Sequence, residues 1–231
     1  MKLPFFAKLA LSLCAVATLS SCSIDDDTTS YQNYPQPAYG IIANASPNSG
    51  DLYFYADANK VNANALNYAD AAGYYNFYTG DRLLSLKDQA GTVLDTTTVT
   101  LNAGQFFSAF AVNNFDDVEL VTYQDSLVYP SQNHARVRFI NLSPDAASID
   151  ISGLTQSFVT GVTFKEATGY IEVQSGIYDI NYKDTATGAS LFTDTAVEFY
   201  PGRIYTIYTK GYVTPATGSN DSFSTELLQN Y

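Results

Sequence analysis

The sequence lacks the residues on which most enzyme active sites are built. It has no tryptophan, one histidine and two cysteines. A Ser-His-Asp triad would have to use His134, and no Gly-x-Ser-x-Gly sequence is present to carry the serine. The acidic pairs at 57–59 and 116–117 do not continue into a calcium-binding loop that ends in glutamate. We therefore predict a protein that is not an enzyme and that binds no metal or other cofactor.

Basic residues are also scarce. Lysine and arginine number 11 against 23 aspartate and glutamate residues, which gives a formal net charge of −12. Because contacts to phosphate groups need clustered lysine and arginine, and no such cluster exists, we exclude nucleic acid as a partner. Binding to an anionic membrane through a basic patch is disfavoured for the same reason.

Aromatic and β-branched residues are abundant instead. The 19 tyrosines and 14 phenylalanines, together with many threonines and valines, favour pleated and half-buried surfaces. A chain of 231 residues with 46% hydrophobic residues is long enough for one large core or two modest ones. The composition predicts an all-β protein.

The N-terminal residues follow the order of a secretory signal peptide, with charged residues first, then an apolar run and then small residues. Lys2 and Lys8 precede an apolar run at 9–19, which is too short to span roughly 30 Å of hydrocarbon. The following Leu19-Ser-Ser-Cys22 resembles the bacterial lipobox, which implies a signal peptide at 1–21 and a lipidated Cys22. The acyl chains would then anchor the protein to a membrane without a spanning segment. An ordinary signal with a chance cysteine is the alternative.

A polar tether follows at residues 22–37. Its acidic cluster, Asp25 to Asp27, resembles the export signal that carries lipoproteins of Bacteroidota to the outer face of the outer membrane. The resemblance implies an outer-membrane protein exposed at the cell surface. A solvated linker that happens to be acidic is the alternative.

The rest of the chain contains a long repeat. Asn44-Ala-Ser-Pro47 aligns with Asn141-Leu-Ser-Pro144 at an offset of 141 − 44 = 97, and 68–74 aligns with 164–170 at 96. A period of this length indicates tandem domains, because solenoid repeats usually have about 20 to 50 residues. We place the first domain at 38–130 and the second at 131–231.

Short strands in which apolar and polar residues alternate predict the fold of each copy. In the second copy, Val137 and Phe139 share one face of a strand, and Ile149 and Ile151 share one face of the next. About seven such strands, separated by turn residues, predict two immunoglobulin-like antiparallel β-sandwich domains. A small barrel is the second choice.

The segment Ala135-Arg-Val-Arg-Phe-Ile-Asn-Leu-Ser-Pro-Asp-Ala146 carries a family resemblance. It resembles the signature of Bacteroidota cell-envelope lipoproteins that contain one or two copies of a domain of unknown function. The resemblance implies an envelope β-sandwich protein and brings no activity or site residues with it. The Asn-Leu-Ser-Pro-Asp part is explained by a strand-ending turn, in which Asn141 and Asp145 hydrogen-bond to nearby backbone groups.

The repeat also predicts which aromatic side chains face outward. Leu52 and Phe54 align with the inward Ile149 and Ile151, so their neighbours Tyr53 and Tyr55 should point to solvent. The same alignment turns Tyr74 and Tyr78 outward. These four tyrosines are candidate ligand-binding residues, because exposed rings stack on sugars or anchor protein contacts. Ordinary exposed strand residues are the alternative.

Five tripeptides that start with aspartate resemble the O-glycosylation sequon of Bacteroidota. The candidate acceptor residues are Thr28, Thr96, Ser126, Thr185 and Thr195.

Together the features of the sequence predict a non-enzymatic, surface-anchored envelope lipoprotein that acts as an adhesion, scaffold or accessory module. The alternative is a carbohydrate-binding accessory of an outer-membrane glycan-uptake system. The expected partners are the membrane, through the N-terminal lipid, and a glycan or an envelope protein.

Overall fold

The structure is a computed structural model that describes residues 36–219 and 221–230. The predicted signal peptide at 1–21, the lipidation site Cys22 and the candidate glycosylation site Thr28 lie outside the described residues. No described helix is both long enough and apolar enough to cross a membrane.

The strands between residues 38 and 125, which we call the first half, form two four-stranded sheets. The inner sheet has the order β4-β1-β7-β8, with β1 (Ala38–Asn44), β4 (Ala71–Phe77), β7 (Phe106–Val112) and β8 (Glu119–Asp125). The outer sheet has the order β3-β2-β5-β6, with β2 (Tyr53–Ala56), β3 (Asn59–Lys60), β5 (Gly80–Lys87) and β6 (Val93–Leu101). A short 3-10 turn at Phe115–Asp117 joins β7 to β8.

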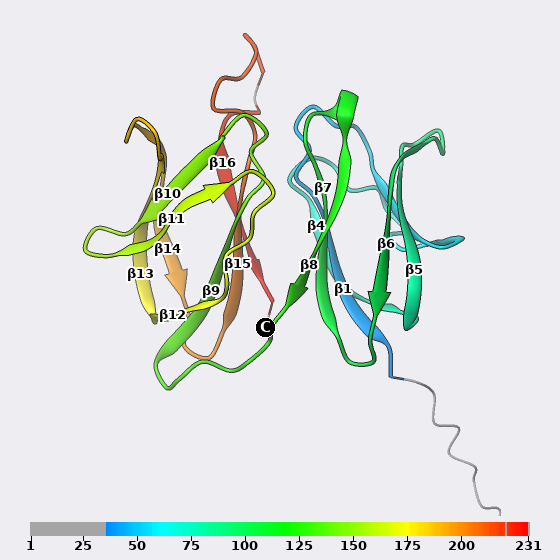
Figure 1. Cartoon of the computed structure of the whole chain (residues 1–231), viewed down its shortest axis with the longest axis horizontal. Coiled ribbons are helices and arrows are strands. Elements are labelled where there is room, and N and C mark those ends of the chain that lie inside the picture. Colours follow the sequence, from blue (N-terminus) through cyan, green and yellow to red (C-terminus); the bar gives the residue numbers. More distant parts are fainter. Residues whose placement is uncertain (1–35, 220, 231) are drawn as a thin grey trace, which may run out of the picture. The chain divides into compact units, whose positions relative to one another are not determined.

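The strands between residues 134 and 229, the second half, repeat this order. The inner sheet is β12-β9-β15-β16, with β9 (His134–Asn141), β12 (Ile171–Gln174), β15 (Ile204–Lys210) and β16 (Ser224–Gln229). The outer sheet is β11-β10-β13-β14, with β10 (Ser148–Ser152), β11 (Ser157–Thr163), β13 (Gly176–Asp184) and β14 (Ser190–Phe199). Figure 1 shows the two inner sheets side by side in the middle, with an outer sheet on either side.

The predicted all-β sandwich class is confirmed, with one correction to its strand directions. Each inner sheet contains a parallel pair, β1 with β7 and β9 with β15, so the sandwiches are not wholly antiparallel. A parallel pair requires the chain to cross over between its two strands, and here the crossover passes through the outer sheet. No sheet in the described part closes into a barrel. Strand β11 was not predicted, because Gly161 interrupts its alternation of apolar and polar residues.

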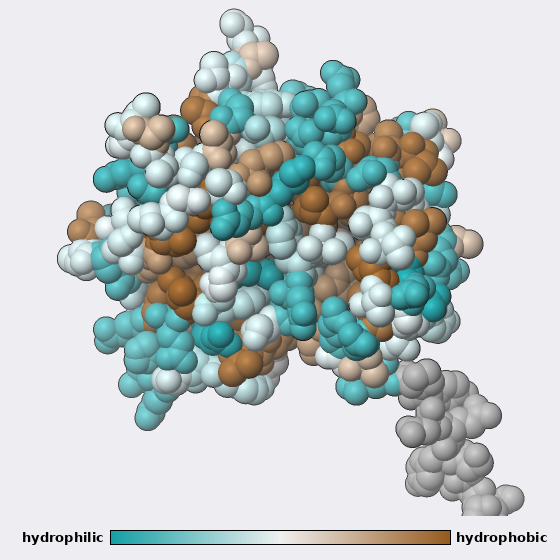
Figure 2. All heavy atoms as spheres, viewed as in Figure 1, coloured by the Kyte–Doolittle hydropathy of each residue, from teal (hydrophilic) through white to brown (hydrophobic). Residues whose placement is uncertain are grey.

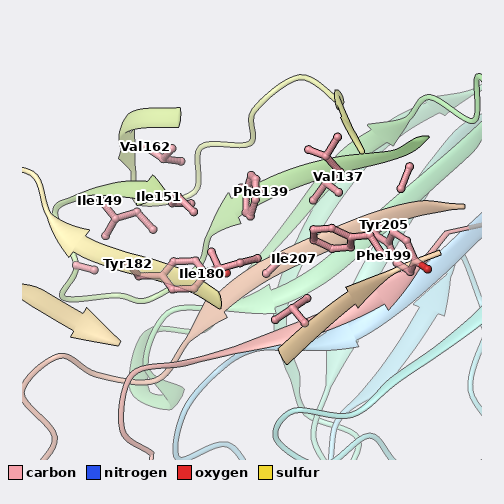
Figure 3. Packing of buried hydrophobic residues seen from close by; sticks show 14 of the residues in the cluster. Val137, Phe139, Ile149, Ile151, Val162, Ile180, Tyr182, Phe199, Tyr205 and Ile207 are labelled. Atoms are coloured by element: carbon pink, nitrogen blue, oxygen red, sulfur yellow. The ribbon is translucent and has the colours of Figure 1, made fainter. Parts of the chain in front are cut away.

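The core of the second half lies between its inner and outer sheets. Val137 and Phe139 from β9 meet Ile149 and Ile151 from β10, and all four side chains are buried, as predicted. Figure 3 shows these side chains along the cluster, with Ile149 and Ile151 toward Tyr182 of β13 and Val137 toward Tyr205 of β15. The first half has an equivalent core that includes Leu52, Phe54, Leu84 and Leu86. Each half therefore buries one face of each of its sheets, which is what a sandwich needs.

A third apolar cluster joins the two halves. Ala43, Ala45, Phe110 and Val112 of the first half pack with Ile140, Leu142 and Tyr208 of the second half. The rings of Phe110 and Tyr208 meet edge to face, with their centroids 5.1 Å apart. We call the contact between the two inner sheets the seam. Because the seam has its own core, the described residues form one compact unit.

The Asn-Leu-Ser-Pro-Asp segment is a structural corner, as predicted. The buried Asn141 amide donates to the carbonyl oxygens of Ala146 and Val162, at 2.9 and 3.1 Å. Its side-chain oxygen accepts from Ser143 N and Thr209 Oγ1. All the polar groups of this side chain are used within the fold, so the corner is not free to bind a ligand.

Candidate functional site

The candidate tyrosines of β2 lie on the outer face of the outer sheet of the first half. Tyr53 and Tyr55 are half-buried and point away from the core, on either side of the buried Phe54. The Lys60 ammonium lies 3.4 Å from the centroid of the Tyr53 ring, and Lys87 lies 4.1 Å from that of Tyr55. These cation–π contacts stabilise the rings and occupy one face of each. A sugar could stack on that face only by displacing a lysine.

Tyr74 also points away from its own core, but it is half-buried. Its hydroxyl donates to Asp125 Oδ2 at 3.0 Å and accepts from Asn230 Nδ2 at 3.1 Å. Burial, and then the negative charge of Asp125, raise the pKa of Tyr74 above its usual range. The side chain points away from its own core as predicted, but that face of the inner sheet is covered by the second half. A ligand-binding role for Tyr74 stays a prediction. Tyr74 belongs to the seam.

The polar part of the seam centres on a buried ion pair. Arg138 Nη2 of β9 donates to Asp125 Oδ1 of β8 at 2.7 Å, and the two side chains are 3% and 0% exposed. Further hydrogen bonds surround the pair, among them Ser108 Oγ to Asp125 at 2.8 Å, Arg138 Nε to Thr206 Oγ1 at 3.2 Å and Thr206 Oγ1 to Asn230 Oδ1 at 2.6 Å. An isolated charge could not be buried at this depth, whereas a paired and hydrogen-bonded one can.

Tyr170 is the counterpart of Tyr74 in the second half. The Arg138 guanidinium carbon lies 4.8 Å from the centroid of its ring. Burial raises the pKa of Tyr170 to about 12, while the nearby positive charge of Arg138 opposes the shift. The two related tyrosines thus lie at the same ion pair.

The remaining candidate, Tyr78, lies at a cleft in the first half. Its side chain is 77% exposed. The cleft has a volume of about 300 Å³ and lies between the β2–β3 hairpin and the end of β4, and its wall includes Asn59, Lys60 and Asn76. An exposed ring beside amide and ammonium groups offers the stacking and the hydrogen bonds that a saccharide uses.

An ion pair stiffens one wall of this cleft. Arg82 Nη1 donates to Asp57 Oδ2 at 2.7 Å, and Leu83 N donates to Asp57 Oδ1 at 3.0 Å. The hydrogen bond from Leu83, followed by that from Arg82, lowers the pKa of Asp57. Arg82 Nε is buried and has no hydrogen-bond partner in the described part of the chain.

The described candidate glycosylation sites are all exposed. Thr96 and Thr195 lie in β6 and β14, which are edge strands of the two outer sheets. Ser126 follows β8 directly, and Thr185 follows β13 with its hydroxyl donating to Asp150 Oδ1 at 2.8 Å. Glycosylation of these residues stays a prediction.

The residues of the seam were missed by sequence reasoning. Alternation in β9 puts Arg136 and Arg138 opposite the core residues Val137 and Phe139, and this placement holds. Nothing in that pattern shows that a second sheet covers Arg138 or that Asp125, at the end of another strand, is its partner.

On the face shown in Figure 2, apolar residues are scattered among polar ones and form no single large patch.

Three comparisons relate the chain to known proteins. No curated protein matches it. The fimbrial anchor protein Mfa2 from Porphyromonas gingivalis is 12% identical over 84% of this chain and 97% of that one, with a TM-score of 0.23. A family 26 carbohydrate-binding module from Eubacterium rectale, solved with maltoheptaose, is 13% identical over 84% and 97%, with a TM-score of 0.26. A putative cell adhesion protein from Bacteroides fragilis is 9% identical over 86% and 98%, with a TM-score of 0.23.

TM-scores at this level carry no argument about function. The family comparison concerns the sequence itself and covers β1 to β10, which is the first half and the start of the second. Residues 39–152 match the family described as a domain of unknown function (DUF4397), so the chain contains a DUF4397 domain.

Proposed function

We propose that the protein is a non-enzymatic module of the bacterial cell envelope that acts in adhesion, or as a scaffold or accessory protein. The observation that carries the proposal is the seam. Two sandwich domains, with their boundary near residue 130, are held together by a shared apolar cluster and by the buried pair Asp125–Arg138. A joint of this kind keeps the exposed surfaces of the two halves in a fixed relation, as a presenting or bridging module requires.

The proposal includes a lipid anchor. Cys22, in its lipobox-like sequence, carries acyl chains that hold the protein on the outer membrane, exposed at the cell surface. The partners are then the membrane through the lipid, and a glycan or an envelope protein through the folded part.

Replacing Cys22 with alanine should release the protein from the membrane. In a host that displays lipoproteins on its surface, the native chain is expected in the membrane fraction and the Cys22→Ala chain in the soluble fraction. Cells that display the native chain should attach to glycan-coated or cell-coated surfaces better than cells that produce Cys22→Ala. Fractionation and attachment counts measure the two effects. Membrane retention of Cys22→Ala would contradict the anchor, and equal attachment of the two strains would contradict the adhesion role.

The Tyr78 cleft favours the alternative, a carbohydrate-binding accessory of a glycan-uptake system. Its exposed ring is surrounded by side chains that can hydrogen-bond to sugar hydroxyls. The other three candidate tyrosines are less suitable, because Tyr53 and Tyr55 are covered by lysines and Tyr74 is part of the seam.

Under this alternative, Tyr78→Ala should weaken glycan binding. The whole chain, purified in detergent, is screened on a glycan array and titrated with the best neutral oligosaccharide. The affinity should fall at least about tenfold in Tyr78→Ala, because loss of a central aromatic contact costs about 2 kcal/mol. Tyr78→Phe keeps the ring and should keep most of the affinity. Tyr200→Ala, at an exposed tyrosine outside the cleft, is the matched control. Saturable binding that Tyr78→Ala leaves unchanged would rule out this cleft.

A further inference from the structure

A second hollow, which we call the seam groove, opens where the two halves meet. It has a volume of about 650 Å³. Thr122, Gln124 and Ser126 line it from the first half, and Arg136, Arg138 and Tyr170 line it from the second. It is therefore separate from the Tyr78 cleft, which lies wholly within the first half.

The charge of the seam groove is opposite to that of the chain. The whole sequence has 23 acidic residues against 11 basic ones, yet two arginines and no acidic residue line this groove. Arg138 is neutralised by the buried Asp125. Arg136 makes no ion pair within the described residues, and its Nη atoms donate only to the carbonyl oxygens of Val128 and Tyr170, at 3.1 and 3.4 Å.

The nearest acidic group on the neighbouring strand is already engaged. Glu172 of β12 lies opposite Arg136 in the strand register. Its Oε1 accepts hydrogen bonds from Ser131 N and Ser131 Oγ, at 3.0 and 3.3 Å, and is not within ion-pair distance of Arg136. The guanidinium of Arg136 thus keeps the capacity to bind an anion, for which its planar donors are well suited.

The polar side chains of the first half that line the seam groove are also available. Thr122 Oγ1, the Gln124 amide and Ser126 Oγ make no hydrogen bond to any of the residues that the structure describes; only the backbone oxygen of Gln124 is used, by Arg138. Hydroxyl and amide groups beside a guanidinium match the hydroxyl groups and the carboxylate of a sugar acid. The Tyr170 ring is not available for stacking, because the guanidinium carbons of Arg138 and Arg136 lie 4.8 and 5.6 Å from its centroid. A peptide with a free carboxylate is the competing occupant, and the titration below separates it from a sugar acid.

We propose that the seam groove binds an acidic saccharide, with the carboxylate of a sugar acid on Arg136 and the sugar hydroxyls on Thr122, Gln124 and Ser126. The site goes beyond the proposed function, because it depends neither on Tyr78 nor on the lipid anchor. It also gives the seam a second role, since the groove exists only while the two halves are held together.

The test is a titration of the whole chain, purified in detergent, with trigalacturonic acid. Its fully methyl-esterified form is the neutral control, and a short peptide with a free C-terminal carboxylate is the second probe. The acidic trisaccharide should bind at least tenfold more tightly than the ester, and its affinity should fall as salt is raised. Arg136→Gln should reduce this affinity at least tenfold. Gln124→Ala, an exposed change that leaves the arginine in place, should reduce it by a smaller factor.

Arg203→Gln is the matched control. Arg203 is an exposed arginine outside the groove, so its loss removes the same charge from the chain and should leave the affinity unchanged. No binding of trigalacturonic acid, equal binding of its ester, or equal losses in Arg136→Gln and Arg203→Gln would each overturn the proposal. Binding of the peptide alone would assign the groove to protein ligands and would also overturn it. Tyr78→Ala should not affect this titration, so failure here is distinct from failure of the Tyr78 cleft.

Discussion

Replacing Asp125 with alanine is expected to lower the free energy of unfolding by about 3 to 5 kcal/mol. The change leaves the guanidinium of Arg138 buried, with its side chain 3% exposed and the only carboxylate partner that it has among the described residues removed. Ser108 and Tyr74 lose their acceptor in the same step. The cost therefore comes mainly from a charge and two hydroxyl groups that can no longer be satisfied.

Urea denaturation followed by far-ultraviolet circular dichroism measures this loss. The double variant Asp125→Leu, Arg138→Met removes both charges and should recover most of the stability, because a buried pair contributes little over an apolar replacement of similar size. Lys165→Met breaks the half-exposed pair with Glu119, which also bridges the two halves, and should cost less than about 1 kcal/mol. Equal losses of stability in Asp125→Ala and Lys165→Met would show that the buried pair contributes no more to stability than the half-exposed pair.

Phe110→Ala should have an effect of similar size through the apolar part of the seam. Phe110 is 0% exposed and packs edge to face against Tyr208 of the other half. Removing a buried phenylalanine ring typically costs about 3 to 5 kcal/mol, through lost transfer free energy and the cavity left behind. Because the ring belongs to the seam cluster, we expect the loss to destabilise both halves.

Tyr208→Phe is the matched control for Phe110→Ala. The Tyr208 ring lies in the same cluster, but its buried hydroxyl has no hydrogen-bond partner in the described part of the chain. Removing that hydroxyl keeps the packing and relieves an unsatisfied polar group, so the stability should stay the same or rise slightly. A large loss in Tyr208→Phe would show that the hydroxyl has a partner and that the cavity argument for Phe110 is incomplete.

The sequence was sufficient to predict which strand faces form the core of the second half. Alternation in β9 and β10 correctly placed Val137, Phe139, Ile149 and Ile151 in one core, because the period of two is a local property of a strand. The corner at Asn141 was also predictable, since its chemistry depends on a few nearby residues. The parallel pairing of β1 with β7 was not, because it depends on how distant strands cross between the sheets.

The contacts between the halves could not be predicted from the same patterns. The alternation of apolar and polar residues predicts that Tyr74 and Arg138 point away from their own cores. It does not predict whether solvent or another sheet covers them. Tyr78 follows the last residue of β4 and is exposed as predicted. The difference between Tyr74 and Tyr78 is thus one of position, within β4 or just beyond it, and not of residue type.

If the seam makes the two sandwiches one unit, they should unfold together. Deuterium uptake of backbone amides at increasing urea concentration, measured on the whole chain and on Phe110→Ala, tests this. Peptides from β5 and β13, in the two outer sheets, report on the halves separately. We expect both to lose protection at one urea concentration, and Phe110→Ala to lower this value equally for both. Two separate transitions, or a shift confined to one half, would contradict it.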